Sequence, residues 1–472
     1  MARGLWRVAT ALTTAAVCTC TILRTTGLLP GLRPVGVADN SDGARLFGAA
    51  GLVPDTADQQ SDWKPGVVLH FRRAEPADDA IPSAALPILR AAAHGFPEQW
   101  SLTRLGRTYA VLTGALAGVA AWAASADHLA GGIALLPVLI PLANRDFVRF
   151  FVSTYSEPAG LVAAVTLLSG TVVLAVSRAG RHVERVHGLA MASGGGLLAI
   201  TAKVGYAPLL PIGAAVCVTT GQHAGRVAAV VALLASVRPV RTALRWQSRF
   251  YPGVNAHNLA FTMVLPEFGP RAATVIGLPP AAAAHAGRGS SDDRGTRTNF
   301  DQIPGWRATI GTDPRRVQLA AYRYLVRHPS RLARVVGVAM QATRGREIDY
   351  LRDDPLPAGS DAQRVVPVTG STGYDRDALR AWLDGMPAPW WPSLLAAVGV
   401  VVGSVACGHR NDLVRAMSRV AGVSAVGAVG IALCAVLGDG YYEIAKHVWL
   451  SGYLLDVTGL SLLGTVVVVL NR

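Results

Sequence analysis

Residues 158–176, PAGLVAAVTLLSGTVVLAV, form an apolar run without a single charged side chain. A run of about 20 such residues is long enough to cross the hydrocarbon core of a bilayer as one α-helix. The rest of the 472-residue chain follows the same pattern, because 51% of its residues are hydrophobic, only 16% are charged, and the apolar ones gather in long runs. The sequence therefore predicts an all-α polytopic membrane protein.

The apolar runs predict about ten membrane spans. Besides residues 158–176, the expected spans cover residues 5–29, 109–124, 129–143, 191–202, 208–220, 227–237, 391–407, 420–437 and 450–470. The three spans between 191 and 237 are short, and this part of the chain contains Gly and Pro, so broken or tilted helices are expected there. A cleaved signal peptide is the alternative for the first run, although that run is long for the apolar region of one.

Arginine residues in the short connections predict how the spans are oriented. They accompany the first run and two later loops, and they are Arg3, Arg7, Arg178, Arg181, Arg185, Arg410, Arg415 and Arg419. Because short cytoplasmic loops are rich in Lys and Arg, we expect both termini on the cytoplasmic side of the plasma membrane. The net charge of +14 is not accompanied by a basic helix or an aromatic-studded sheet pattern, so the expected partner is membrane lipid and not nucleic acid.

Composition divides the chain into three regions. They are an N-terminal transmembrane module (1–237) with an outer loop (33–107) and an interfacial helix (144–157), an extracytoplasmic loop region with short helices (238–388), and a C-terminal transmembrane module (389–472). Within the middle region, residues 279–299 are rich in Gly, Ser, Asp and Arg, a composition that predicts a mobile segment.

Acidic residues lie just outside the ends of spans that are far apart in the sequence. There are six of them on the predicted outer face: Asp39, Asp42, Asp146, Glu157, Asp439 and Glu443. A carboxylate beside hydrocarbon is held there against a desolvation penalty of several kcal/mol, so each is a candidate for function. Because all six acids lie on the same predicted face of the membrane, we expect them to form a single extracytoplasmic active site.

The first acidic segment, residues 37–46 with the sequence VADNSDGARL, directly follows the first span. Asp39 and Asp42 are three residues apart and can converge on one site. Arg45 can orient a carboxylate or bind a phosphate through its planar set of donors. The alternative is a solvated loop in which an Asp caps a short helix.

The second segment, residues 146–158 with the sequence DFVRFFVSTYSEP, mixes acids with aromatic residues. Asp146 and Arg149 recur at helical spacing, whereas Phe150 and Tyr155 can form an aromatic belt at the membrane surface. Aromatic faces combined with carboxylates are typical of sugar sites. The alternative is a helix that only anchors the chain in the interface.

The third segment, residues 438–447 with the sequence GDGYYEIAKH, contains two acids, two tyrosines, a lysine and a histidine within a short connection. Lys446 and His447 can hold a phosphate or shuttle a proton, and the alternative is an amphipathic turn with a contact between Glu443 and His447. Lys203, at the outer end of a short span, can bind a lipid phosphate or simply extend its amine to the interface.

No cofactor and no metal ligands are assigned among these residues. A divalent metal is compatible with the acids, but no H-x-x-E-H or similar ligand spacing accompanies them. The five cysteines all lie in apolar runs and are Cys18, Cys20, Cys217, Cys407 and Cys434. Neither a disulfide framework nor a metal framework is therefore expected.

The same segments, in this order, resemble a known family. The chain resembles the actinobacterial glycan-biosynthesis hexose transferases of the GT-C glycosyltransferase superfamily. The likeness rests on ADNSDG at 38–43, STYSEP at 153–158, AK at 202–203, GLP at 277–279, HP at 328–329 and GDG at 438–440. Thr154 stands where the family usually has an aromatic residue.

The resemblance implies transfer of a sugar from a polyprenyl-phosphate donor to an extracytoplasmic glycan, lipid or protein acceptor. By this likeness Asp42, with Asp39 beside it, acts as the base in an inverting displacement. The departing lipid phosphate would be held by cations, for which the candidates are Arg45, Lys203, Lys446 and His447. The sugar or acceptor would be contacted by Asp146, Arg149, Tyr155, Glu157, Asp439 and Glu443.

Two other functional classes fit a polytopic chain. A transporter or lipid flippase would carry charges at the bilayer midplane and would have two similar halves, and the sequence shows neither pattern clearly. A non-catalytic accessory protein of cell-envelope glycan assembly would keep the fold without the chemistry. Both alternatives stay open at the level of sequence.

Overall fold

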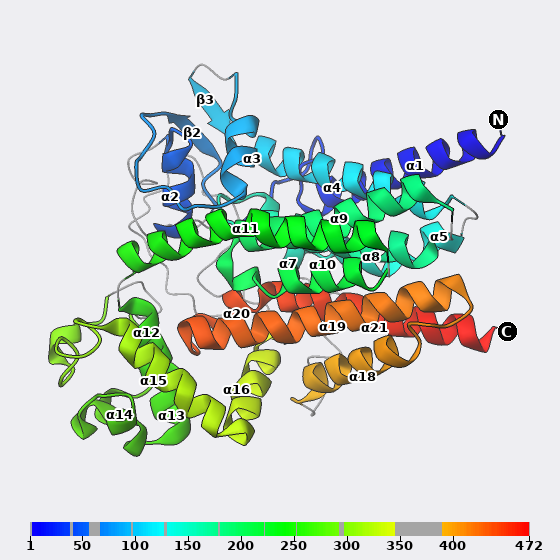
Figure 1. Cartoon of the computed structure of the whole chain (residues 1–472). Coiled ribbons are helices and arrows are strands. Elements are labelled where there is room, and N and C mark those ends of the chain that lie inside the picture. The colour runs from blue at the N-terminus through cyan, green and yellow to red at the C-terminus, as the bar shows by residue number, and fades with distance from the viewer. Residues whose placement is uncertain are drawn as a thin grey trace.

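The computed structural model describes residues 2–37, 41–55, 67–95, 98–126, 130–177, 180–220, 222–251, 253–291, 297–344 and 389–471. Its main feature is a bundle of long helices lying side by side (Figure 1). The bundle consists of α1 (Ala2–Thr25), α4 (Leu102–Ala124), α8 (Glu157–Val176), α9 (His182–Ala202), α10 (Leu209–Val218), α11 (His223–Phe250), α18 (Trp391–Val405), α19 (Asp412–Asp439) and α21 (Trp449–Leu470). Both termini lie at the same end of the bundle (Figure 1).

A broken segment connects α4 to α8. It is built from α5 (Ala130–Ile133), α6 (Leu136–Leu139), η2 (Ile140–Ala143), α7 (Arg145–Val148) and η3 (Arg149–Phe151). Its two parts, Gly131–Ala143 and Arg145–Phe151, meet at an angle of 74°. Pro137 and Pro141 interrupt the helical hydrogen bonding of the first part, because proline has no backbone N–H to donate.

The helices confirm the all-α polytopic class. Among the described residues, five helices are individually long and apolar enough to cross a membrane, and the bent pair would make a sixth. The five are Gly4–Thr25, Glu157–Val176, His223–Phe250, Asp412–Asp439 and Trp449–Leu470. The other expected spans also coincide with helical segments, but these are shorter or less apolar, so the count of about ten remains a prediction.

Helix α8 lies at the centre of the bundle. All of its residues from Glu157 to Val176 are buried, which explains why this helix is apolar on every side. It packs closely on α9 because glycines line the contact: a Cβ on Gly170 would come within 2.5 Å of the backbone nitrogen of Ala192, and one on Gly195 within 2.5 Å of that of Leu167. Small residues thus let the two backbones approach.

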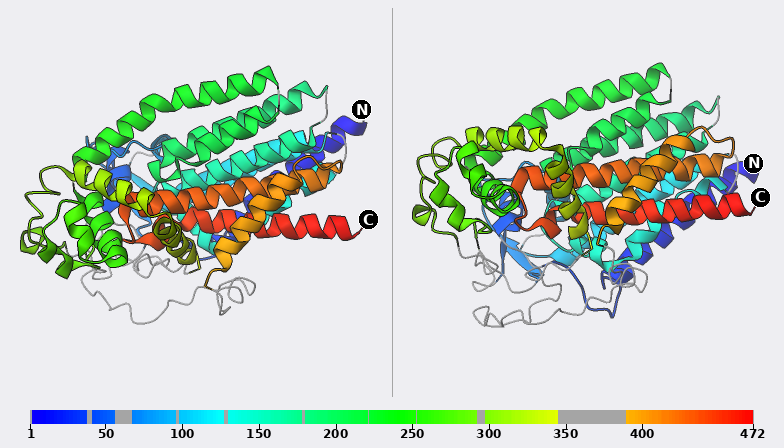
Figure 2. Two further views of the ribbon diagram at one scale, coloured as in Figure 1. Left: turned by 60° about the horizontal axis from the view of Figure 1, so that its bottom comes forward. Right: turned by 90° about the horizontal axis from the view of Figure 1, so that it is seen from below.

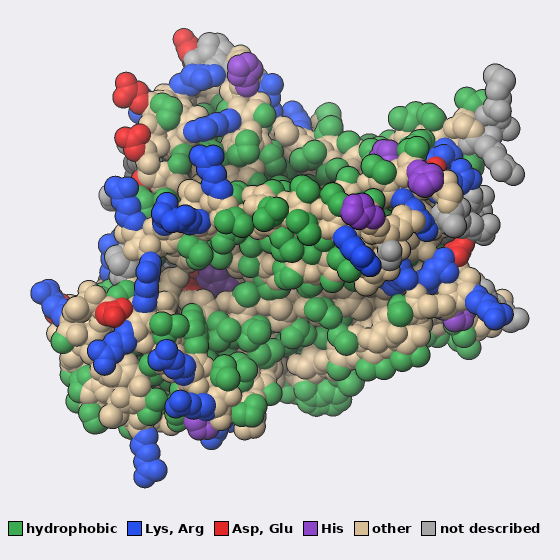
Figure 3. Space-filling model, viewed as in Figure 1, with side chains coloured by type: hydrophobic (Ala, Val, Ile, Leu, Met, Phe, Trp, Pro, Cys, Tyr) green, Lys and Arg blue, Asp and Glu red, His purple; other side chains and the backbone are tan. Residues whose placement is uncertain are grey.

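The boundary expected at 237/238 falls inside a helix. α11 continues through Pro239 to Phe250, so the N-terminal module and the following region share one continuous element. The expected boundary marked the end of the apolar run, but arginine is a good helix former and the helix simply passes from an apolar to a basic half. Figure 3 shows this face, with hydrophobic side chains over the middle of the bundle and Lys and Arg toward its ends.

The end of the bundle away from the termini is capped by two small structures (Figures 1 and 2). One contains α2 (Ser41–Ala49), α3 (Ala85–Ala92) and an antiparallel sheet of order β1-β2-β3, with β1 (Leu52–Pro54), β2 (His70–Arg73) and β3 (Gln99–Ser101). Phe71 pairs with Trp100 in this sheet, and their rings meet edge to face at 5.5 Å. The outer loop expected at 33–107 is thus partly an ordered cap.

The second cap follows α11 and is helical. It contains α12 (Val254–Asn258), the π-helix η5 (Leu259–Val264), α13 (Leu265–Phe268), α14 (Arg271–Val275), η6 (Pro280–His285), η7 (Phe300–Gln302), α15 (Pro314–Arg327) and α16 (Pro329–Ala342). The segment expected to be mobile, 279–299, includes η6 and donates from the Gly287 backbone N–H to the Phe261 carbonyl at 2.7 Å. Residues 292–296 of that segment lie outside the described residues.

Candidate functional site

Three of the four segments singled out in the sequence meet at the capped end of the bundle. Glu157 begins α8, Lys203 directly follows α9, and Asp439 ends α19 just before the short helix α20 (Ile444–His447). The termini lie at the opposite end, where Arg7 of α1 pairs with Glu184 of α9 at 2.9 Å. Packing of the bundle therefore brings together residues that are far apart in the sequence: Glu157 and His447 are 290 positions apart.

The centre of this cluster is an ion pair between Glu157 and Lys203. Nζ of Lys203 donates to Oε1 of Glu157 at 2.7 Å, and the Glu157 side chain is only 1% exposed, whereas that of Lys203 is 26% exposed. A buried carboxylate requires such a partner, because removing its water costs several kcal/mol. The amine of Lys203 thus serves a buried acid on one side and remains accessible on the other.

A second lysine lies beside this pair. The side chain of Lys446 is 2% exposed, and its Nζ is 3.4 Å from Oε2 of Glu443 and 5.1 Å from the centroid of the Tyr155 ring. The aromatic face and the carboxylate both stabilise the buried ammonium group. Lys446 also interacts electrostatically with Glu157, so the two lysines and two glutamates form one region of charges at low solvent exposure.

Asp439 is held between two other groups. Its Oδ1 accepts a hydrogen bond from Nδ2 of Asn258 at 2.7 Å, and its Oδ2 lies 3.2 Å from Nε2 of His447. The backbone N–H of Ser290 donates to Oδ1 of Asn258 at 2.7 Å, which fixes the orientation of that amide. The alternative for this segment was a turn with a contact between Glu443 and His447, but the His447 side chain approaches Asp439 instead.

Glu443 has a strained backbone. Its φ of 45° and ψ of 32° place it in the left-handed helical region, and it is the single non-glycine residue with positive φ among those the structure describes. This conformation costs an L-residue roughly 1–2 kcal/mol, so the surrounding structure must hold it in place. A strained residue that carries a carboxylate beside Lys446 is a candidate for function.

Replacing Glu443 by Gly and by Ala should separate strain from chemistry. Both changes remove the carboxylate next to Lys446, but only glycine adopts positive φ at no steric cost. We expect Glu443→Gly to be about 1 kcal/mol more stable than Glu443→Ala in thermal unfolding. Both variants should lose substrate affinity to a similar degree, and equal stability of the two would contradict a strained backbone at this position.

His257 is fully buried and directly precedes Asn258, the residue that donates to Asp439. Nε1 of Trp306 donates to its Nδ1 at 3.1 Å, so the ring is neutral with its hydrogen on Nε2, which lies 3.1 Å from the carbonyl oxygen of Arg288. Burial lowers the pKa of His257 to about 4. This histidine therefore ties α12 to the Trp306 segment and does not act as a proton shuttle near neutral pH.

Lowering the pH should destabilise the protein through His257. An exposed histidine titrates near about pH 6.5, so the unfolded chain gains a proton that the folded protein, with a pKa of about 4, does not accept. The stabilisation is fully present above about pH 6.5 and is lost as the pH falls toward about 4, by roughly 3 kcal/mol. Thermal unfolding measured across this range tests it.

The matched variant for that measurement is His257→Asn. It should be less stable at neutral pH, because one side chain cannot replace both ring contacts, and it should show a weaker pH dependence than the wild type. An NMR titration of the His257 ring with a midpoint near about pH 6.5 would contradict the buried neutral state.

The second acidic segment differs from expectation. Residues 144–157 do not form one interfacial helix, because α7, η3 and a bend run inside the protein. Asp146, Arg149 and Tyr155 are all buried, and Phe150 packs on Trp449 with ring centroids 4.5 Å apart. The aromatic residues that suggested a membrane-surface belt belong to the protein core, since α21 and α4 cover them.

The first acidic segment is only partly described. Asp39 lies outside the described residues, and so does the side chain of Asp42, whose backbone belongs to α2. Just before them, the backbone N–H of Val37 donates to the carbonyl of Val152 at 3.2 Å. The chain therefore enters the Asp39–Asp42 stretch directly beside the segment that leads to Glu157.

Arg45 occupies a different position from the lysines. It bonds to the Tyr251 hydroxyl, and its guanidinium lies 5.5 Å from the centroid of the Trp246 ring at the end of α11. Cation–π packing of this kind fixes the side chain. The structure thus places Arg45 against α11, whereas Lys203 and Lys446 lie by Glu157.

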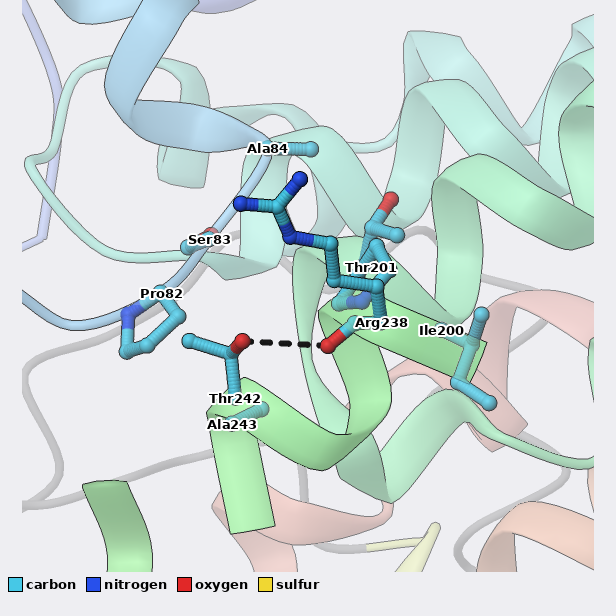
Figure 4. Close-up of a pocket in the computed structure, with 9 residues that line it drawn as sticks. Pro82, Ser83, Ala84, Ile200, Thr201, Arg238, Thr242 and Ala243 are labelled. Carbon is cyan, nitrogen blue, oxygen red and sulfur yellow. Dashed lines mark hydrogen bonds between the residues drawn. The ribbon is translucent and has the colours of Figure 1, made fainter. Parts of the chain in front are cut away.

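A hollow of about 320 Å³ opens next to the backbone that carries Lys203 (Figure 4). Its wall includes Ser83, whose Oγ donates to the carbonyl of Ala202 at 2.8 Å, and Thr201, whose carbonyl accepts from the backbone N–H of Ala84 at 2.9 Å. The side chain of Arg238 extends across it toward Ala84 (Figure 4). Arg238 is a further cation at this end of the bundle.

Three residues at this end of the bundle carry no clear signal in the sequence: Asn258, His257 and Arg238. Asn258 and His257 lie in an ordinary-looking stretch, VNAHN, and their importance depends on contacts with residues far away in sequence. In the sequence, Arg238 marks only the expected start of the middle region at 238–388. No group of three His, Cys, Asp or Glu side chains that could hold a metal occurs in the part of the chain that the structure describes, which leaves out Asp39 and the Asp42 side chain.

Comparison with known proteins gives one match. No curated protein and no solved structure matches the chain. A family model described as the YfdI N-terminal transmembrane domain matches residues 6–471, which is nearly the whole sequence. The protein therefore belongs to the family of the YfdI N-terminal transmembrane domain.

Proposed function

We propose that the protein is an integral membrane glycosyltransferase of the GT-C type. It transfers a sugar from a polyprenyl-phosphate donor to an extracytoplasmic glycan, lipid or protein acceptor. The observation that carries this proposal is the meeting of Glu157, Lys203, Lys446 and Asp439 at one end of the bundle. The family match supports a multi-pass membrane protein, and the sequence motifs support the class of reaction.

Lys203 and Lys446 are suited to hold the lipid phosphate. The departing polyprenyl phosphate is an anion, so cations fixed in advance stabilise it as the bond breaks. Glu157 keeps the Lys203 ammonium group in place at 2.7 Å before the donor arrives. Because both lysines lie in a region of low exposure, their attraction for a phosphate is stronger than it would be in water.

Asp42, with Asp39 beside it, is assigned the role of base. Its carboxylate takes the proton of the acceptor hydroxyl while that oxygen attacks the anomeric carbon from the face opposite the phosphate. The bond between the anomeric carbon and the phosphate oxygen breaks, and its electron pair leaves with the polyprenyl phosphate. A single displacement inverts the anomeric centre.

Several other groups are assigned to the sugar or acceptor. Asp439 offers a carboxylate fixed by Asn258 and His447, and carboxylates of this kind accept hydrogen bonds from sugar hydroxyls. Asp146, Arg149 and Tyr155, which are buried in the segment that leads to Glu157, are assigned to the same substrates. The site is assigned to the extracytoplasmic face, because the termini and the Arg-rich loops lie at the opposite end.

The proposal is tested with the full protein in liposomes. A labelled hexose should be transferred from a polyprenyl phosphate but not from a nucleotide, since only the lipid donor reaches a site at the bundle end from the membrane. A panel of polyprenyl-phosphate hexoses and cell-envelope acceptors provides the substrates. Transfer from the nucleotide sugar alone would contradict the proposal, and so would transport of an unmodified solute.

A further inference from the structure

A separate apolar groove runs between α9 and α11. Its volume is about 610 Å³, and its walls extend along α9 from Val186 to Leu197 and along α11 from His223 to Ala232. The two helices run in the same direction, because the first residues of both lie at one end of the groove. None of the residues that line it belongs to the cluster around Glu157.

The length of the groove matches one lipid leaflet. The eleven helical steps from Val186 to Leu197 span about 16 Å at about 1.5 Å per residue. Half of a hydrocarbon core of about 30 Å is close to this value. Val227 and Val231 in its wall are exposed large apolar residues, which is expected of a surface that contacts acyl chains.

Small residues in the wall of the groove leave room between the two helices. They are Ala190 and Gly194 on α9 and Ala224 and Ala228 on α11. A Cβ added at Gly194 would have no heavy atom within 4 Å. A ligand atom can therefore occupy the space beside Gly194 without moving any protein atom.

Basic residues lie near one end of the groove, and one of them, His223, lines it. His182 and Arg185 lie in the first turn of α9, and His223 and Arg226 lie in the first turn of α11. The acid in the same stretch, Glu184, is buried and pairs with Arg7, so it does not face this opening. The mouth is therefore positive, whereas the groove behind it is apolar.

We propose that this groove binds an anionic phospholipid. One acyl chain lies between α9 and α11, and the headgroup phosphate lies by Arg185 and Arg226, where the positive mouth attracts negative lipid. The mouth is at the end that carries the termini, opposite the Glu157–Lys203 pair. The site is thus distinct from the proposed donor site and does not depend on the proposed reaction.

The binding is tested by native mass spectrometry of the full protein in detergent, with phosphatidylglycerol or phosphatidylcholine added. We expect phosphatidylglycerol to bind preferentially and to raise the unfolding temperature. Gly194→Leu should abolish the bound lipid, because its side chain occupies the groove. Gly4→Leu is the matched control, since Gly4 on α1 also has no atom within 4 Å of an added Cβ, and it should bind as the wild type does.

The headgroup contact is tested by the double variant Arg185→Gln/Arg226→Gln. Its affinity for phosphatidylglycerol should fall roughly tenfold or more, while that for phosphatidylcholine stays unchanged. Arg327→Gln, an exposed arginine on α15, is the control. Equal binding of the two lipids, or lipid binding unaffected by Gly194→Leu, would overturn the proposal. Recovery of a polyprenyl phosphate from the groove would overturn it too, and so would a wild-type dimer that Gly194→Leu converts to a monomer.

Discussion

Asp42→Asn should abolish sugar transfer while the protein remains folded in the membrane. An asparagine keeps the size of the side chain but cannot accept the acceptor's proton, and loss of a general base costs roughly a factor of 10²–10⁴ in rate. The measurement is transfer from a labelled polyprenyl-phosphate sugar in liposomes that contain equal amounts of each protein. Asp39→Asn, tested in parallel, decides which of the two neighbouring acids is the base.

The control for this substitution is Asp78→Asn. Asp78 is an exposed acid in the same cap, so the same change of chemistry there should leave transfer unchanged. Full activity of the Asp42 variant would remove Asp42 from the role of base. Loss of activity accompanied by loss of folded protein would point instead to the capping role of an Asp at the start of α2.

Lys203→Met should both destabilise the protein and stop transfer. It leaves the carboxylate of Glu157, 1% exposed, without the ammonium group that lies 2.7 Å away. Breaking a buried pair by removing one partner costs about 3 kcal/mol or more, because the remaining charge stays buried. Thermal unfolding in detergent measures the stability, and the liposome assay measures the transfer.

The double variant Glu157→Gln/Lys203→Met separates structure from function. With both charges gone, stability should return close to that of the wild type, but transfer should remain lost because the phosphate has lost a cation. Glu157→Gln alone should also be severely impaired. An active double variant would mean that the pair only supports the fold.

An exposed ion pair provides the comparison for the stability measurement. Arg307 and Asp301 are joined by hydrogen bonds, but their side chains are 78% and 55% exposed. Solvent screens a pair as exposed as this one, so Arg307→Met should change the unfolding temperature little. A similar loss in Arg307→Met and Lys203→Met would contradict the special role of burial at Glu157.

The fold class can be predicted from the sequence because the apolar residues of each span lie in one continuous run of the chain. Residues 158–176 are apolar on every side, and the structure buries this helix completely. Helix ends are less predictable, as α11 shows: its apolar run stops near Val237, but the helix continues to Phe250 because arginine does not disfavour helical backbone.

The candidate site follows from the sequence only in part. Glu157 and Lys203 are each conspicuous because a charge lies at the end of an apolar run, but their pairing depends on how α8 and α9 pack. Asn258 gives no local signal, since its role arises from contact with Asp439. The predicted membrane-surface belt of Phe150 and Tyr155 is wrong, because both side chains are buried. Aromatic residues in a buried bend give the same sequence pattern as aromatic residues at a membrane surface.

The central claim is tested most directly by following the fate of an anomerically pure polyprenyl-phosphate sugar. The purified protein, supplied with this donor and an acceptor, should release one polyprenyl phosphate for each glycoside formed, and the new bond should have the inverted configuration. Retention of configuration would contradict the single displacement. A donor that remains intact, or that is only moved across the bilayer, would contradict the assignment as a glycosyltransferase.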